Sequence, residues 1–117
     1  MKISLKPLDK IFSQYIKLRD RCCQRCWGSG NQTAHFHSRR YRSVRWDELN
    51  ACLCCFGCHQ YLDSHPLEKI EFFRQRLGER AFDLLTVRAN TRQKTDEKVL
   101  TIYLKDLIAK LEMKDGS

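Results

Sequence analysis

The chain has 117 residues, 42% of them hydrophobic, and a formal net charge of +8. This length fits one domain, predicted to span residues 1–117, and a domain this small is often reinforced by a metal or by disulfides. The excess of positive charge favours a polyanionic partner such as nucleic acid, although a basic surface can also serve solubility alone.

The first residues, MKISLKPLDK, are basic but lack the apolar run of a secretory signal. The apolar stretches are also too short to cross a membrane. We therefore expect a cytoplasmic protein with no membrane partner, in a reducing setting. The seven cysteines are an odd number, so they cannot all pair within the chain. In a reducing compartment, paired cysteines indicate metal more often than disulfides.

The N-terminal half is predicted to contain one helix, two strands and the start of a second helix. Apolar residues at three- and four-residue spacing predict the first helix over 8–20. A turn rich in glycine follows the first cysteines, and the strands are expected over 33–38 and 49–54. The second helix is expected to begin near residues 55–58 and to run through Leu62.

The C-terminal half is predicted to be helical over 67–77, 81–87 and 100–111. Gly78 ends the first of these stretches, and Thr95 and Asp96 are candidates to cap the third. The fold class is therefore α+β. A hairpin and helix form a core over about residues 20–66, flanked by an N-terminal helix and a helical extension over 67–114.

Two pairs of cysteines have the spacing of a zinc site: Cys23 with Cys26, and Cys55 with Cys58. Two intervening residues allow both thiols of a pair to reach one ion, and two such pairs complete a tetrahedral site. Cys52 with Cys55 has the same spacing, so the second pair has a rival. Cys22, Cys52 and Cys54 remain outside the favoured set, and burial as small apolar residues would explain the last two.

Histidines surround this pattern. His35 and His37 lie in the first predicted strand, Asn50 precedes the second cysteine pair, and His59 directly follows Cys58. The stretches AHFHSRR and RWDELNACLCCFGCH, framed by the two cysteine pairs, resemble the zinc-bearing HNH endonucleases, including phage-type members. The resemblance covers roughly residues 20–66.

The resemblance implies a ββα-metal fold and a metal-dependent DNA endonuclease. In that family a strand histidine is the general base, an asparagine orients it, and a helix histidine binds the catalytic metal. His35, Asn50 and His59 match these roles. A neutral imidazole can take a proton from water, and a divalent ion such as Mg²⁺ or Mn²⁺ can stabilise charge on the phosphate. The alternative for His35 is a structural strand residue.

Many family members carry a further metal ligand just before the base, where this chain has Ala34. The second protein ligand must therefore come from elsewhere. His37 is one candidate, because residues two apart on a strand share a face. Asp63, one helical turn after His59, and His65 are others.

The segment between the strands is basic and contains Arg39, Arg40, Arg42 and Arg45. We expect these residues to contact DNA phosphates rather than bases, the alternative being a solvated loop. A monomer is favoured over a dimer, and a monomer with one site would nick DNA. Two other classes remain: a non-catalytic zinc-finger module that binds nucleic acid, and a redox protein, for which no bound zinc is expected.

Overall fold

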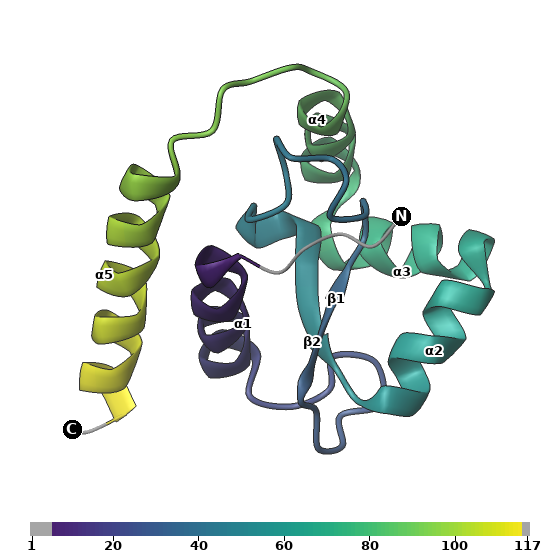
Figure 1. Cartoon of the computed structure of the whole chain (residues 1–117). Helices are drawn as coiled ribbons and strands as arrows, with labels where there is room; N and C mark the ends of the chain where they lie inside the picture. Colours follow the sequence, from purple (N-terminus) through teal and green to yellow (C-terminus); the bar gives the residue numbers. More distant parts are fainter. Residues whose placement is uncertain (1–5, 116–117) are drawn as a thin grey trace.

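A two-stranded antiparallel sheet lies at the centre of the molecule, with helices on both sides (Figure 1). The computed structural model describes residues 6–115. Strand β1 (Gln32–His35) pairs with β2 (Ala51–Cys54), so that Gln32 lies opposite Cys54 and His35 opposite Ala51. Within the described residues the sheet is accompanied by five α-helices: α1 (Pro7–Asp20), α2 (Phe56–Ser64), α3 (Pro66–Leu77), α4 (Glu79–Ala89) and α5 (Glu97–Asp115). The predicted α+β class is confirmed.

Both strands are shorter than predicted, and the side chain of Asn50 explains where β1 ends. The backbone N–H of Phe36 still donates to the Asn50 carbonyl, at 2.8 Å. The next N–H, that of His37, donates instead to Asn50 Oδ1, at 2.8 Å. Backbone pairing thus gives way to a side-chain contact, and the predicted strand over 33–38 is wrong beyond His35. The predicted second strand is wrong at its start, because Glu48–Asn50 forms a 3₁₀ turn, η1.

Helices α1 and α5 pack together on one side of the sheet. The period of apolar residues in α1 places Leu8, Phe12 and Ile16 on one face, and all three are buried. They pack with Leu104 and Ile108 of α5 in one core cluster. Because this cluster joins the two ends of the described chain, the C-terminal helix is part of the same folded unit as the sheet.

The opposite side of the sheet is covered by α2, α3 and α4 (Figure 1). Phe36 lies between Phe73 and Phe82, with both pairs of ring centroids 5.1 Å apart. Leu62 of α2 is buried in the same cluster. This apolar packing fixes α2 against β1, and α2 carries one of the predicted active-site histidines.

The helix boundaries follow local signals. Cys55 caps α2, since its Sγ accepts from the backbone N–H of Cys58 at 3.3 Å. Gly78 separates α3 from α4 with φ 87°, a backbone conformation that favours glycine. Asp96 Oδ1 accepts from the N–H groups of Lys98 and Val99, which confirms its predicted capping role. No helix within residues 6–115 is long and apolar enough to span a membrane.

Candidate active site and metal centre

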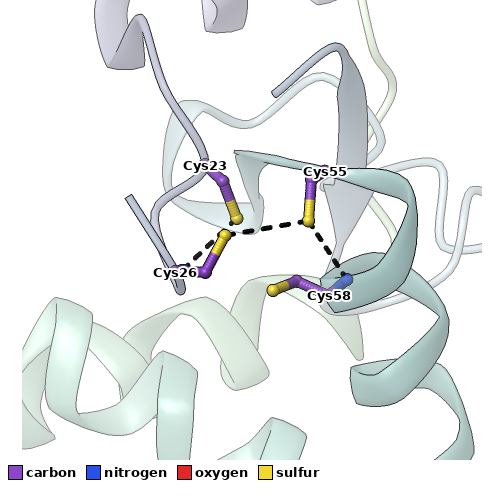
Figure 2. A group of neighbouring side chains, drawn as sticks. All are labelled: Cys23, Cys26, Cys55 and Cys58. Carbon is purple, nitrogen blue, oxygen red and sulfur yellow. Dashed lines mark hydrogen bonds between the residues drawn. The ribbon is translucent and has the colours of Figure 1, made fainter. Parts of the chain in front are cut away.

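Four cysteines converge from two chain turns, as Figure 2 shows. Cys23 and Cys26 lie in the turn after α1, while Cys55 and Cys58 lie at the start of α2. Their four Sγ atoms all lie within 4.8 Å of one another, and within residues 6–115 this is the one group of histidine, cysteine and acidic side chains with such spacing. These are the two predicted pairs, so the rival pairing of Cys52 with Cys55 is not the one that the structure assembles.

The spacing of these sulfurs fits a tetrahedral metal such as zinc. Four sulfurs at about 2.3 Å from a central ion lie about 3.8 Å apart. Cys26 Sγ and Cys55 Sγ are 3.8 Å apart. In each pair a backbone N–H points at the first sulfur, from Cys26 to Cys23 at 3.5 Å and from Cys58 to Cys55 at 3.3 Å. Such N–H groups stabilise thiolates, the form in which cysteine binds metal.

Charges around the cluster support the same role. Burial opposes ionisation of Cys23, but backbone N–H groups outweigh it and lower the pKa of this thiol to about 6. Arg25 donates to Cys58 Sγ at 3.4 Å and stacks over the ring of Tyr61, 4.1 Å from its centroid. Because a metal with four thiolates carries net negative charge, a neighbouring guanidinium partly offsets that charge.

The remaining cysteines lie outside the cluster. Cys52 and Cys54 are fully buried in β2, with their sulfurs 3.8 Å apart, and both pack in the apolar core. The neighbouring Cys52 thiol and burial raise the pKa of Cys54, which keeps it a neutral thiol. Cys22 is half-buried. The two strand cysteines thus pack as small apolar residues.

A cleft of about 740 Å³ lies between α1, β1 and α2. His35 from the end of β1 and His59 from the first turns of α2 both line it. Two of the four histidines named in the sequence prediction therefore share one hollow. The other charged or hydroxyl side chains around it are Lys6, Asp9, Lys10, Ser13, Thr33, Ser38, Arg39, Asp63 and Lys69.

His35 has a defined tautomer. Its Nε2 lies 3.0 Å from the backbone carbonyl oxygen of Arg45. A carbonyl can only accept, so Nε2 carries the proton and Nδ1 keeps its lone pair. Burial lowers the pKa of His35 to about 4, which leaves the ring neutral at pH 7. A neutral imidazole with a free Nδ1 can accept a proton.

Asn50 connects the end of β1 to the loop that follows it. The side chain is fully buried. Its Nδ2 donates to the carbonyl oxygens of His37, at 2.9 Å, and of Val44, at 3.0 Å. Its Oδ1 accepts from the backbone N–H of His37, so both the oxygen and the nitrogen of this amide bind the segments on either side of the basic loop. Asn50 therefore holds these segments, and with them the carbonyl group of the adjacent Arg45 that orients His35.

His59 is held between two side chains. Its Nδ1 lies 2.7 Å from Gln32 Oε1, an amide oxygen that accepts, so Nδ1 donates. Its Nε2 lies 3.4 Å from Asp63 Oδ2, one helical turn further along α2. The second oxygen of Asp63 binds Lys69 Nζ at 2.7 Å. A ring nitrogen and a carboxylate oxygen this close can hold a cation between them.

The structure corrects two of the predicted site residues. His37 follows the end of β1 and does not line the cleft; its ring contacts Phe36 and Tyr41 and lies 3.5 Å from Thr86 Oγ1. The predicted strand continued through residue 38, and only a continuing strand would put His37 on the same face as His35. His37 therefore does not line the cleft that contains His59.

Arg45 is the second correction. Only 4% of its surface is exposed, and its guanidinium binds both oxygens of Asp9, at 3.0 and 2.6 Å. Asp9 also accepts from Trp46 Nε1 at 2.9 Å. Burial acts to raise the pKa of Asp9, but these donors outweigh it and hold that pKa below its usual range. Arg45 is thus a buried structural residue, whereas Arg40 and Arg42 are exposed and Arg39 lines the cleft.

The sequence prediction missed Gln32, Lys69 and Asp9, which lie beside the predicted residues. The spacing of polar residues gives no signal for Gln32, because its role depends on α2 crossing the start of β1. Lys69 reaches Asp63 from the next helix. Asp9 has the signal of an acidic residue in a first helical turn, which predicts a cap and not a buried ion pair.

No protein-family model, no curated protein and no solved structure matches this chain.

Proposed function

We propose that the chain is a metal-dependent DNA endonuclease of the HNH type, in which β1, β2 and α2 form a ββα-metal motif. The observation that carries the proposal is the shared cleft. His35, a neutral histidine with a lone pair on Nδ1, and the pair of His59 with Asp63 line the same hollow. Four cysteines can stabilise the surrounding fold by binding zinc. A proton acceptor and a bound cation in such proximity would promote hydrolysis of a phosphodiester.

His35 is the proposed general base. A water oxygen attacks phosphorus, and its proton passes to Nδ1 of His35, while Nε2 continues to donate to the Arg45 carbonyl. The bond between phosphorus and the 3′-oxygen breaks, and that oxygen takes a proton from solvent. The products are a 5′-phosphate and a 3′-hydroxyl. Asn50 is a positioning residue, because it acts through the segment that carries this carbonyl.

His59 and Asp63 are the proposed ligands of the catalytic divalent ion, Mg²⁺ or Mn²⁺. Their facing atoms, a nitrogen and an oxygen, suit such an ion, and Gln32 fixes the ring from its other nitrogen. A divalent ion bound there would stabilise charge on the phosphate and on the departing oxygen. Asp63 thus replaces the ligand that Ala34, fully buried in β1, cannot provide.

The cations at the rim of the cleft suit a phosphate substrate. Lys10 is exposed on α1, and Arg39 lies on the opposite loop. Their positive charge attracts the DNA backbone without reading its sequence. One cleft in one chain favours single-strand nicking by a monomer.

The test is nicking of supercoiled plasmid by the zinc-loaded protein, with and without added Mg²⁺ or Mn²⁺. We expect open-circular product only with the added ion. The Asp63→Asn variant is expected to need at least about 10-fold more ion, while the exposed Asp83→Asn control behaves as wild type. A protein that binds DNA but never cuts it would instead be the non-catalytic zinc module.

A further inference from the structure

A second hollow has a volume of about 460 Å³. One wall is the basic loop over residues 40–43. The other is the segment over 89–94, the end of α4 and the first part of the connection to α5, which Figure 1 shows as an extended green stretch. The two walls are far apart in the sequence, so no sequence motif contains both of them.

The hollow is strongly cationic. Among residues 6–115, its lining contains four cations and no acidic side chain, the cations being Arg40, Arg42, Arg92 and Lys94. All four are exposed. The carboxylate of Glu97 lies 3.5 Å from Arg42, but Lys6 shares that carboxylate at 3.0 Å. The hollow therefore keeps a clear positive balance, which attracts an anion with several charges.

Hydrogen bonds fix the shape of the hollow. Ser43 Oγ donates to the backbone carbonyl of Arg88 at 2.6 Å and so ties the loop to α4. At the end of α4, Asn90 Nδ2 donates to the Thr86 carbonyl and Thr91 Oγ1 to the Val87 carbonyl, at 2.9 and 2.7 Å. These contacts reduce the negative charge that free carbonyls at a helix end would place there.

The hollow is continuous with the cleft along the chain. Arg39 lines the cleft and its neighbour Arg40 lines the hollow. Because consecutive residues line the cleft and the hollow, one phosphate backbone can contact both.

We infer that this hollow binds the phosphate backbone of duplex DNA to one side of the bond in the cleft. The identity of the polymer rests on the proposed function. The hollow anchors DNA through charge and is indifferent to sequence, because exposed arginine and lysine side chains read phosphates and not bases.

The test measures DNA binding by the full-length, zinc-loaded protein at several salt concentrations without added divalent ion. The variant is Arg92→Gln with Lys94→Gln. The matched control, Arg80→Gln with Lys105→Gln, removes the same charge from exposed positions outside both hollows. We expect the hollow variant to reduce the slope of log K against log salt by about 1–2 and the control to leave it nearly unchanged.

Equal slopes for the two variants would overturn the inference, as would tighter binding of RNA than of duplex DNA of the same length. Zinc content and thermal stability check that both variants fold. Plasmid nicking provides a separate readout. If the wild type never nicks but the hollow variant loses slope, the proposed catalysis fails and the DNA contact stands. If the wild type nicks and both variants bind alike, only the DNA contact fails.

Discussion

Nε2 of His35 lies 3.0 Å from the backbone carbonyl oxygen of Arg45, and the guanidinium of that same arginine is buried against Asp9. The residue that orients the proposed base is therefore itself held by α1. This links the N-terminal helix to the proposed base in the cleft, through an ion pair between residues far apart in the sequence.

The first prediction concerns that ion pair. Arg45→Met leaves the Asp9 carboxylate buried without its main partner, so we expect a loss of about 3 kcal/mol in the free energy of unfolding, measured with urea. Arg42→Met is the control, because 64% of that side chain is exposed, and it is expected to change stability by less than about 0.5 kcal/mol. Similar losses for both variants would mean that the buried pair does not stabilise the fold.

A second prediction concerns Asn50, whose amide donates to two carbonyl oxygens. Asn50→Asp puts a carboxylate oxygen in place of the donating nitrogen, so we expect a loss of at least about 2 kcal/mol in urea unfolding. Asn90→Asp is the matched control. That amide donates to one carbonyl on an exposed helix end, and its variant should stay within about 0.5 kcal/mol of wild type. Equal effects would contradict the bridging role.

The third prediction is a pH dependence of stability. The pKa of His35 is lowered to about 4 in the folded chain and is about 6.5 in the unfolded chain. The unfolded chain therefore takes up a proton first as the pH falls, and the stability that His35 contributes above pH 6.5 is lost progressively down to pH 4.

Between about pH 8 and pH 5.5, we expect the wild type to lose about 1 kcal/mol more than His35→Gln, which cannot titrate. Urea unfolding at both pH values measures the difference, and zinc analysis at both checks that the metal stays bound. Parallel losses in the two proteins would show that His35 titrates normally in the fold.

The fourth prediction is one zinc ion per chain. Cys55→Ser removes a ligand and is expected to abolish zinc binding and cooperative unfolding, because a site of four sulfurs loses its closed geometry. Cys52→Ser, in the rival position, should retain one zinc. Elemental analysis of both variants separates the two pairings. Zinc retained by Cys55→Ser, or lost from Cys52→Ser, would reverse the assignment.

Much of this arrangement could be predicted from local signals. The periodic apolar residues predicted four of the five helices described over residues 6–115 within a few residues, and the two cysteine spacings predicted the cluster that the structure assembles. The same spacings fixed the start of α2 and hence the position of His59. Each of these features depends on residues that are close together in the sequence, so one sequence is enough to predict it.

The remaining features depend on contacts between distant segments. β1 ends where Asn50 takes over its hydrogen bonds, which moved His37 away from the cleft. Arg45 belongs to a basic stretch, and only its contact with Asp9 distinguishes it from Arg40 and Arg42. The residues next to a charged residue in such a stretch do not indicate that its side chain is buried.

The most direct test compares two histidines that are two residues apart. Cleavage of a labelled DNA duplex is followed under single-turnover conditions with Mn²⁺, for the wild type, His35→Gln and His37→Gln. We expect the cleavage rate of His35→Gln to fall at least about 100-fold and that of His37→Gln to stay within a few-fold of wild type, because His35 lines the cleft and His37 does not. No cleavage by the wild type, or equal rates for the two variants, would contradict the proposed active site.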